Sequence, residues 1–357
     1  MHSDEYFMRL ALALALKAKG KTSPNPLVGA VIVKDNRIIG QGYHKKAGMP
    51  HAEVIALNQA GKRAKNATLY VNLEPCSHYG RTPPCIDKII ASEIKKVVIA
   101  MVDPNPFNNG KGIKLLRGLG VKVKTGVLNK EARDLNKQFI KYITKHLPYV
   151  TVKIAQSLDG KIATKNYNSK WITSAKARQF AHRLRDNFDA IILGTNTILK
   201  DNPNLKTKKA IRVIIDKDLK ISQDLNLFNY RKTKIIIATR KINTNKQYPK
   251  NVELIVIKES DDKLDLVDLM RKLADKGIIN ILVEGGGELI GSLFDEKLVN
   301  EIKFFIAPKI IGGKSAISSI TGQGIKNINS AIGLKDIKIS NISKDLLVEA
   351  EVVYRDN

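Results

Sequence analysis

The sequence predicts two α/β domains that meet near residue 147. Three observations lead to this prediction. The chain has 357 residues, more than one hydrophobic core usually serves. Apolar runs typical of strands alternate with helical segments up to about residue 140. The same alternation begins again with the apolar run YVTVKIA at 149–155, directly after a proline that a helix tolerates poorly. We therefore expect one domain over residues 1–146 and a second over 147–357.

The first half begins with a short apolar segment, residues 8–20, which we interpret as a buried helix. Two apolar runs at 27–33 and 37–43 are joined by Lys-Asp-Asn, which predicts a hairpin. Gly61 is expected to end a helix that starts near His51. The further elements expected here are a strand at 67–73, a helix opened by Pro83-Pro84, a strand at 96–102, a short helix at 112–120 and a linker at 141–148.

The second half shows the same pattern after the strand at 149–155. A helix is expected from about Ser174 to Phe188, with Thr173 or Ser174 as its N-cap. The run INILVEGGGELIGSLF predicts a strand, a glycine loop and a helix. The remaining expected elements are strands at 190–194, 212–216, 234–239 and 252–257 and an amphipathic helix near 262–276.

Composition indicates a globular chain, with 43% hydrophobic and 27% charged residues. The apolar run within 8–20 is too short to span a membrane. Asp4 and Glu5 stand where a signal peptide would need basic residues. We therefore expect a cytoplasmic protein without membrane partners, in which a structural disulfide between the two cysteines is disfavoured.

The net charge of +27 is spread along the chain rather than gathered in a tail. Residues 1–145 hold 25 basic against 10 acidic residues, and the remainder holds 36 against 24. Nucleic-acid binders usually concentrate their basic residues on one face or helix. We expect a lysine-rich, solvated surface without a specific nucleic-acid partner. Such a surface also suits an anionic, phosphorylated small-molecule substrate.

The strongest chemical pattern joins His51, Glu53 and the two cysteines, Cys76 and Cys85. One imidazole and two thiolates leave a fourth position open, which is the arrangement of a catalytic zinc ion with a bound water. Glu53 stands two residues after His51, where it can move protons without binding the metal. A His-x-Glu followed by Pro-Cys and a second cysteine matches the signature of zinc deaminases. The spacing departs from P-C-x-x-C, because eight residues separate the cysteines.

This longer spacing is similar to that of the bifunctional riboflavin-biosynthesis deaminase–reductases. The motifs of the first half that carry the resemblance are PNPLVGAVIV, GYHKKAG, PHAEV, LEPCSHYGRTPPC and DPNP. Those of the second half are KIAQSLDGKIA, SKWIT, DAIILGTNTILKDNP, EGGGELIGSLF and IAPKIIGG. Together they cover nearly the whole chain.

The resemblance implies a cytidine-deaminase-like three-layer α/β domain followed by a dihydrofolate-reductase-like α/β domain. The first would be a zinc hydrolase that removes the 2-amino group of a diamino-ribosylamino-pyrimidinone 5′-phosphate. The second would be an oxidoreductase that uses NADPH to convert the ribosyl group of the product to ribityl. Glu53 would be the catalytic residue and His51, Cys76 and Cys85 the metal ligands. The resemblance implies deaminase substrate contacts at Asn25, His44, His78 and Arg81.

In the second half the glycine loop VEGGGEL is weak support when taken alone, since it is neither a Walker loop nor a G-x-G-x-x-G motif. The resemblance adds residue roles to it. The implied cofactor contacts are Ala155, Trp171, Thr197, Asp201, Gly286 and Gly287. The implied substrate contacts are Lys153, Ser169, Arg185, Leu205, Lys208 and Glu284.

Several alternatives stay open at this point. Arg185 could belong to a solvated helix face, and Trp171 could serve packing. Lys208 replaces the arginine usual in the family and loses its bidentate fork, while Lys217 stands where a small hydroxyl residue is usual and could meet the 2′-phosphate of the cofactor. A tRNA or single-strand deaminase fused to an unrelated domain is one competing function, and a structural zinc module is another. We expect a homo-oligomer.

Overall fold

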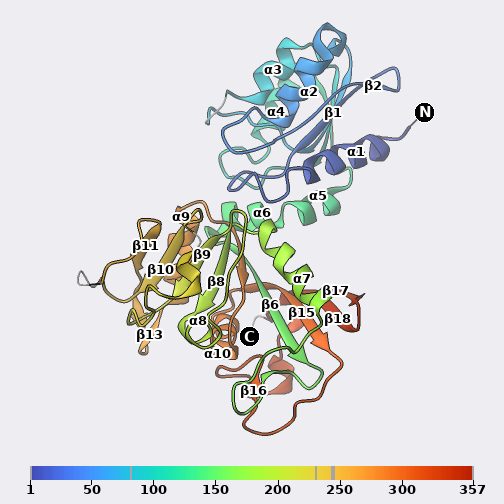
Figure 1. The fold of residues 1–357 in the computed structure, drawn as a ribbon. Coiled ribbons are helices and arrows are strands. Elements are labelled where there is room, and N and C mark those ends of the chain that lie inside the picture. Colours follow the sequence, from blue (N-terminus) through green and yellow to red (C-terminus); the bar gives the residue numbers. More distant parts are fainter. Residues whose placement is uncertain (1, 81–82, 230, 243–245, 356–357) are drawn as a thin grey trace. The chain divides into compact units, whose positions relative to one another are not determined.

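The computed structural model describes residues 2–80, 83–229, 231–242 and 246–355 (Figure 1). The chain separates into two compact units, Met1–Leu147 and Pro148–Asn357. This division lies one residue from the expected boundary. No helix among the described residues is long and apolar enough to cross a membrane.

The first unit is built on a mixed sheet with the strand order β2-β1-β3-β4-β5. Strand β1 pairs antiparallel with β2 and β3, whereas β3, β4 and β5 run parallel. The strands are β1 (Gly29–Lys34), β2 (Arg37–Tyr43), β3 (Thr68–Leu73), β4 (Lys96–Met101) and β5 (Lys122–Thr125). The helices are α1 (Asp4–Leu16), α2 (Ala52–Ala60), α3 (Cys85–Ala91), α4 (Lys111–Gly118), α5 (Asn129–Leu135) and α6 (Lys137–Lys145), with a 3₁₀ turn at Gly61–Ala64.

Helices cover both faces of this sheet and make three layers (Figure 1). Helix α1 contacts β1, β3 and α5. Among the other helices, α2 contacts α3, and α3 contacts α4. The sequence explains these elements locally. Ser3 caps α1 by accepting a hydrogen bond from the backbone of Tyr6, and the hairpin turn between β1 and β2 uses Asp35 and Asn36 with positive φ.

The second unit is built on a sheet with the strand order β11-β10-β9-β8-β14-β6-β15-β18-β17. The strands from β11 to β15 are parallel, and the hairpin of β17 and β18 closes one edge antiparallel. These strands are β6 (Tyr149–Ser157), β8 (Ala190–Gly194), β9 (Ile211–Ile215), β10 (Ile235–Thr239), β11 (Val252–Val256), β14 (Asn280–Val283), β15 (Val299–Ala307), β17 (Gly333–Ile342) and β18 (Asp345–Val353). Short pairs join β7 (Lys161–Ala163) to β16 (Ile317–Ser318), and β12 (Glu259–Ser260) to β13 (Lys263–Leu264).

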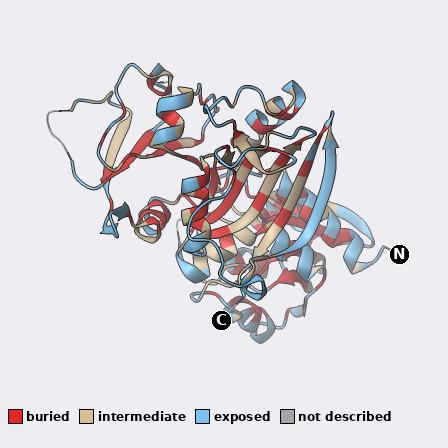
Figure 2. Ribbon diagram, turned by 90° about the horizontal axis from the view of Figure 1, so that it is seen from below, coloured by how far each residue is buried: buried red, intermediate tan, exposed pale blue. Residues whose placement is uncertain are grey.

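The helices of this unit are α7 (Ala175–Leu184), α8 (Thr195–Asp201), α9 (Leu266–Asp275) and α10 (Gly287–Asp295), with 3₁₀ turns at Arg185–Asn187, Asn226–Asn229 and Ile328–Ser330. Ser174 caps α7 by accepting a hydrogen bond from Ala177, which confirms one of the two expected caps. Helix α7 packs Ala177 and Ala181 against Phe305 and Leu347 of the sheet. Figure 2 shows the resulting burial, with red inner strands and pale blue turns and outer helix faces.

Three expectations about elements were wrong. Residues 141–148 are not a linker up to the proline, because α6 continues to Lys145. The first helix starts at Asp4 rather than near residue 8, since Ser3 supplies the cap. Helix α9 begins at Leu266, because Asp265 caps it and the residues before it form β13.

The close approach of α1 to β1 predicts a strong effect of one methyl group. A Cβ on Gly29 would lie 2.1 Å from the carbonyl oxygen of Ala11 and 2.8 Å from the nitrogen of Ala15. Gly29→Ala should therefore lower the free energy of unfolding of the first unit by about 1–3 kcal/mol. Gly118→Ala, at the end of α4, is the matched control, because a Cβ there meets nothing within 4 Å. Urea unfolding followed by far-UV circular dichroism measures both. Equal midpoints for Gly29→Ala and wild type would contradict this packing.

Candidate functional site

The expected metal ligands of the first unit lie at the starts of helices α2 and α3 and just after the end of strand β3. His51 is the N-cap of α2, and Cys85 is the first residue of α3. Cys76 follows the end of β3 at Leu73. The two cysteines are not joined by a disulfide. Proline before each helix start, Pro50 and Pro84, agrees with the helix starts that the sequence predicted.

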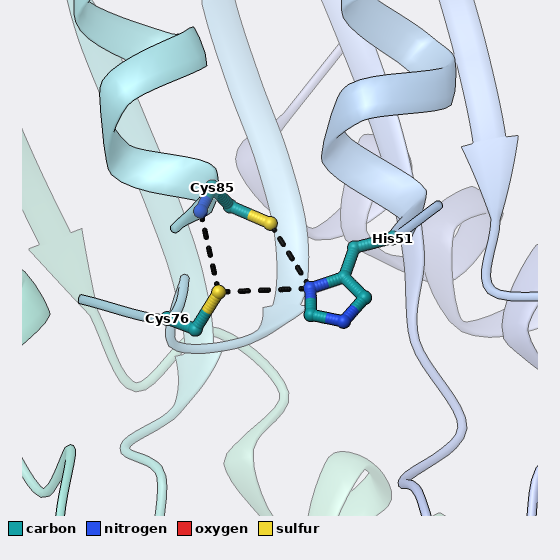
Figure 3. Close-up of side chains that lie close together, drawn as sticks. All are labelled: His51, Cys76 and Cys85. Carbon is teal, nitrogen blue, oxygen red and sulfur yellow. Dashed lines mark hydrogen bonds between the residues drawn. The ribbon is translucent and has the colours of Figure 1, made fainter. Parts of the chain in front are cut away.

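The three side chains converge on one point (Figure 3). The Nδ1 atom of His51 lies 3.1 Å from Sγ of Cys85 and 3.6 Å from Sγ of Cys76. All the ligand atoms lie within 4.8 Å of one another. Tetrahedral zinc, with bonds near 2.0–2.3 Å, would separate such atoms by roughly 3.5–3.8 Å. The two nitrogen-to-sulfur distances lie near this range, so the donor set fits a zinc ion.

The two thiols influence each other because they are close. The contact with Cys85 lowers the pKa of Cys76 to about 4, and His51 adds to this effect. The same contact and burial raise the pKa of Cys85. A cation among the three ligands would favour both thiolates.

Glu53 lies in the first turn of α2 and is only 3% exposed. Its Oε2 atom is buried without a hydrogen-bond partner among the described residues. Burial raises the pKa of Glu53 to about 7, and the charge of Cys76 acts in the same direction. A buried carboxylate oxygen left without a partner costs free energy. A water at the open metal position would supply the missing partner.

His51, Glu53 and Cys76 line a cavity of about 310 Å³. Asn25, His44 and His78, all expected to contact the substrate, line the same cavity as His51 and Glu53. The Nδ1 atom of His78 is buried without a partner among the described residues. Arg81, the fourth expected contact, lies outside the described residues.

Hydrogen bonds fix the protonation of His44. Its Nδ1 lies 3.2 Å from the carbonyl oxygen of Pro50, which can only accept. Its Nε2 lies 3.0 Å from Nδ2 of Asn25, which can only donate. Burial lowers the pKa of His44. The ring is therefore neutral, and it holds the Asn25 amide in one orientation toward the cavity.

Glu74 is a structural hydrogen-bond acceptor. Its buried carboxylate accepts hydrogen bonds from the backbone nitrogens of Asp103, Gly110 and Ile113. These contacts bind the end of β3 to the loop after β4 and to the start of α4. Glu74 thus shapes the floor of the cavity.

A second cavity, of about 510 Å³, lies in the second unit. It collects most of the residues to which the family resemblance assigns cofactor or substrate contacts. Its lining includes Lys153, Ala155, Ser169, Trp171, Arg185, Thr197, Asp201, Leu205, Glu284 and Gly286.

A buried ion cluster forms one wall of this cavity. Arg185 donates two hydrogen bonds of 2.8 Å to the carboxylate of Glu284, and Lys153 lies 3.9 Å from it. Arg185 is 7% exposed, so the alternative of a solvated helix face is wrong. Burial raises the pKa of Glu284, but Lys153 and Arg185 outweigh it and hold the pKa near 2.

Four other expected residues have distinct surroundings. Trp171 is 61% exposed, and the guanidinium of Arg178 lies 4.2 Å from its ring centre, so its ring packs on Arg178 and not in the core. Gly287 packs against the chain at Ser318 and is not among the lining residues. Lys208 is also outside the lining and is exposed. Lys217 pairs with Asp262 and, at 3.1 Å, with Glu259.

Sequence reasoning missed some cavity residues. Asp103 and Asn105 line the first cavity, although their motif DPNP contributed to the sequence analysis only through the family resemblance. Arg178 and His182 line the second. Their spacing from Arg185, at i, i+4 and i+7, places Arg178 and His182 on the face of α7 that leads to Arg185 directly after the helix, and it could have indicated them.

Comparisons with known proteins agree with this geometry. Residues 1–101 match the cytidine and deoxycytidylate deaminase zinc-binding region, and residues 148–348 match the RibD C-terminal domain. A riboflavin biosynthesis protein RibD of Aquifex aeolicus is 45% identical, with 97% of each chain covered. The chain belongs to the RibD family. An Escherichia coli member is 38% identical, covering 96% of this chain and 98% of its own.

Solved RibD structures extend the likeness to the fold. One from Acinetobacter baumannii has a TM-score of 0.87 at 33% identity, covering 98% of this chain and 99% of its own. A protein from Thermotoga maritima has a TM-score of 0.85 at 36% identity, covering 98% of each chain. The expected fold class, a cytidine-deaminase-like domain followed by a reductase domain, is confirmed.

Membership of the RibD family defines the class of activity. The chain is a bifunctional enzyme of riboflavin biosynthesis, with a zinc hydrolase unit that deaminates and an oxidoreductase unit that reduces. A nicotinamide cofactor and a small-molecule pyrimidine substrate follow from these two activities. The alternatives of a nucleic-acid deaminase with an unrelated second domain and of a non-enzymatic zinc module are wrong.

The ligand geometry predicts metal content. Purified protein should contain about one zinc per chain, since three ligands and a water complete a tetrahedron. His51→Ala should lose most of it, whereas His146→Ala, an exposed histidine in the same unit, should retain it. Inductively coupled plasma mass spectrometry measures the ratio. Zinc-free wild-type protein with full deaminase activity would falsify the site.

The ion cluster of the second unit predicts a pH-dependent stability. The pKa of Glu284 in the folded state is about 2, below the usual value of 4.5. Ionised Glu284 therefore stabilises the fold above pH 4.5, by roughly 3 kcal/mol, and this stabilisation is lost as the pH falls toward 2. Urea unfolding at several pH values should show Glu284→Gln less stable than wild type at pH 7, with a gap that narrows below pH 4.5.

The control for this titration is Glu296→Gln, which changes an exposed glutamate of the same unit. Its stability should follow that of wild type at every pH. A gap between Glu284→Gln and wild type that stays constant from pH 7 to pH 3 would show that Glu284 is not held ionised by its neighbours.

Proposed function

We propose that the first unit deaminates a 2,5-diamino-6-ribosylamino-4(3H)-pyrimidinone 5′-phosphate and that the second unit then reduces the product with NADPH. The Thermotoga maritima relative is named a diaminohydroxyphosphoribosylaminopyrimidine deaminase and 5-amino-6-(5-phosphoribosylamino)uracil reductase. The observation that supports the proposal most is the cluster of His51, Cys76 and Cys85 beside Glu53. His51, Cys76 and Glu53 line one cavity, and Oε2 of Glu53 is buried there without a hydrogen-bond partner among the described residues.

In the deaminase step, water adds to the ring carbon that bears the 2-amino group, and the carbon–nitrogen bond breaks to release ammonia. A zinc ion held by His51, Cys76 and Cys85 would lower the pKa of water toward about 7. Glu53 takes a proton at its carboxylate and passes it to the departing amine. Burial raises the pKa of Glu53, which favours holding the proton, while a zinc ion beside it would favour the ionised form that accepts one.

In this cavity we assign the positioning of the pyrimidine to neutral polar side chains, those of Asn25 and His78. The Asn25 amide, held by neutral His44, offers its remaining hydrogen-bonding capacity to a pyrimidine edge. His78 contributes a buried Nδ1 that no described residue satisfies. Arg81, between the cysteines, is the proposed contact for the substrate phosphate.

In the reductase step, a hydride passes from the cofactor to C1′ of the ribosyl group, the ring C1′–O4′ bond opens, and O4′ receives a proton. Lys153 and Arg185 give the cavity positive charge for a phosphorylated substrate, and Glu284 holds Arg185 in place. Ser169 and Leu205 complete the proposed substrate contacts, with Lys208 nearby on the chain. Proposed cofactor contacts are Ala155, Trp171, Thr197, Asp201, Gly286 and Gly287.

We also propose NADPH rather than NADH as the cofactor, a homo-oligomeric state and a cytoplasmic location. The cofactor choice rests on the family resemblance, because Lys217 is engaged by Asp262 and Glu259 and is not available as the expected 2′-phosphate contact. The cytoplasmic location rests on the two unpaired cysteines, whose role as metal thiolates suits a reducing compartment.

Glu53→Gln separates the two activities. Glutamine is nearly isosteric and leaves the metal ligands untouched, but it cannot accept the water proton. The variant should keep zinc and lose about 10²- to 10⁴-fold in deamination. It should still oxidise NADPH when given the deaminated compound, and fail with the diamino precursor. Ammonia release and cofactor absorbance at 340 nm report the two steps, with NADH compared at equal concentration.

The reciprocal variants complete this test. Asp201→Ala and Lys153→Ala change the second cavity, so they should release ammonia from the diamino precursor and stall before reduction. If Glu53→Gln abolishes reduction of the deaminated compound while zinc and fold are retained, the assignment of two separate sites is wrong.

A further inference from the structure

We propose that Asn108 is a positioning residue that orients the metal ligand Cys76. The inference rests on the proposed zinc site and concerns a residue with no role in the chemistry described above. Asn108 lies in the loop between β4 and α4, more than 30 positions along the chain from Cys76. Its side chain is completely buried.

The Asn108 amide binds the two peptide groups that flank Cys76. Its Oδ1 atom accepts a hydrogen bond of 3.1 Å from the backbone nitrogen of Ser77, and Oγ of Ser77 donates a second, of 2.7 Å. Its Nδ2 atom donates to the carbonyl oxygen of Pro75 at 3.3 Å. The carbonyl of Pro75 precedes Cys76 and the N–H of Ser77 follows it. Asn108 therefore holds both peptide planes on which the backbone torsions of Cys76 depend.

We call the three hydrogen bonds of Asn108 to Ser77 and Pro75 the Asn108 clamp. The fourth hydrogen bond of Asn108 connects this clamp to the cavity wall. Nδ2 of Asn108 donates to Oδ2 of Asp103 at 3.2 Å, and Asp103 lines the deaminase cavity. The other carboxylate oxygen of Asp103 accepts from the backbone of Asn105. All four hydrogen-bonding positions of the Asn108 amide are thus used. Its orientation is fixed, because the Ser77 N–H must face an oxygen and the Pro75 carbonyl must face an N–H.

Fixing the peptide planes around Cys76 fixes the direction of its Cα–Cβ bond, and hence the reach of Sγ. The sulfur is held at its far end as well, by the backbone N–H of Cys85 at 3.2 Å. Without the clamp, the turn after β3 would have more conformational entropy. Metal binding would then have to order this turn, which lowers the affinity. Groups that orient metal ligands in this way typically contribute about 10- to 100-fold in metal affinity.

No other side chain reproduces this pairing at the same size. Aspartate keeps an acceptor for Ser77 but loses both N–H groups, and it places a second carboxylate against Asp103. Alanine removes the clamp entirely and leaves the Pro75 carbonyl without its partner. Asn108→Asp and Asn108→Ala thus break the clamp in different ways and at different cost to folding.

The test measures metal binding in the full-length protein. Zinc is removed with a chelator, and zinc affinity is then measured by competition with a chromogenic chelator. Co²⁺ titration adds a spectroscopic signature, since the thiolate-to-cobalt absorption near the ultraviolet reports the sulfur bonds. Asn108→Ala and Asn108→Asp should each lower zinc affinity about 10- to 100-fold and weaken the thiolate band. Ser77→Ala, which removes one of the four hydrogen bonds, should have a smaller effect.

Asn109→Ala is the matched control, because it makes the same change at the exposed neighbouring position. It should bind zinc as wild type does. If wild type itself binds no zinc, the proposed metal site fails. If wild type binds zinc and both Asn108 variants bind it equally well with an unchanged Co²⁺ spectrum, the positioning role is overturned, even if their unfolding temperatures fall. If Asn108→Ala does not fold, the result with Asn108→Asp decides.

Discussion

The satisfaction of buried polar groups is the constraint on which both sites depend. Polar atoms removed from water must find partners inside the protein. In the first unit, Glu74 accepts three backbone N–H groups and Asn108 uses its whole amide. These contacts join the ends of β3 and β4 to the start of α4. Against this background the unpartnered oxygen of Glu53 is an exception, and it lies where the proposed chemistry needs a free acceptor.

Sheet direction explains why distant segments meet. Strands β3 and β4 are parallel, so the turn with Cys76 and the loop with Asp103 emerge at the same edge. In the second unit β8 and β14 are parallel neighbours, and Thr197 and Glu284 follow their ends. The carboxyl edge of a parallel sheet is the usual place for ligands in such folds. The fold thus presents both cavities at strand ends, where loops can vary without disturbing the core.

Much of this arrangement was predictable, for local reasons. The hairpin between β1 and β2 follows from Asp35-Asn36, which tolerate positive φ. Prolines mark the starts of two helices, since Pro50 precedes the N-cap of α2 and Pro84 is the N-cap of α3. The cluster of His51, Cys76 and Cys85 was predictable because these residue types at this spacing are specific for zinc chemistry. Helix α6 differs from the expected linker because Pro148 restricts mainly the residue before it, so the helix continues to Lys145. The sequence alone does not reveal contacts between side chains that are far apart along the chain. Arg185 was ambiguous because its partner, Glu284, lies 99 residues away and only the fold brings them together.

The two buried glutamates, Glu53 and Glu284, show that the charges of neighbouring side chains set the pKa of a carboxyl group when burial is similar. Burial raises the pKa of both Glu53 and Glu284. Beside Glu53 stands Cys76, whose negative charge raises the pKa further, to about 7. Beside Glu284 stand Lys153 and Arg185, whose positive charges bring it to about 2. A zinc ion would offset the thiolate charge near Glu53 and move its pKa downward, so the metal favours the basic form that accepts a proton. Glu284 stays ionised across the physiological range, so its role is to hold two cations in place rather than to exchange protons.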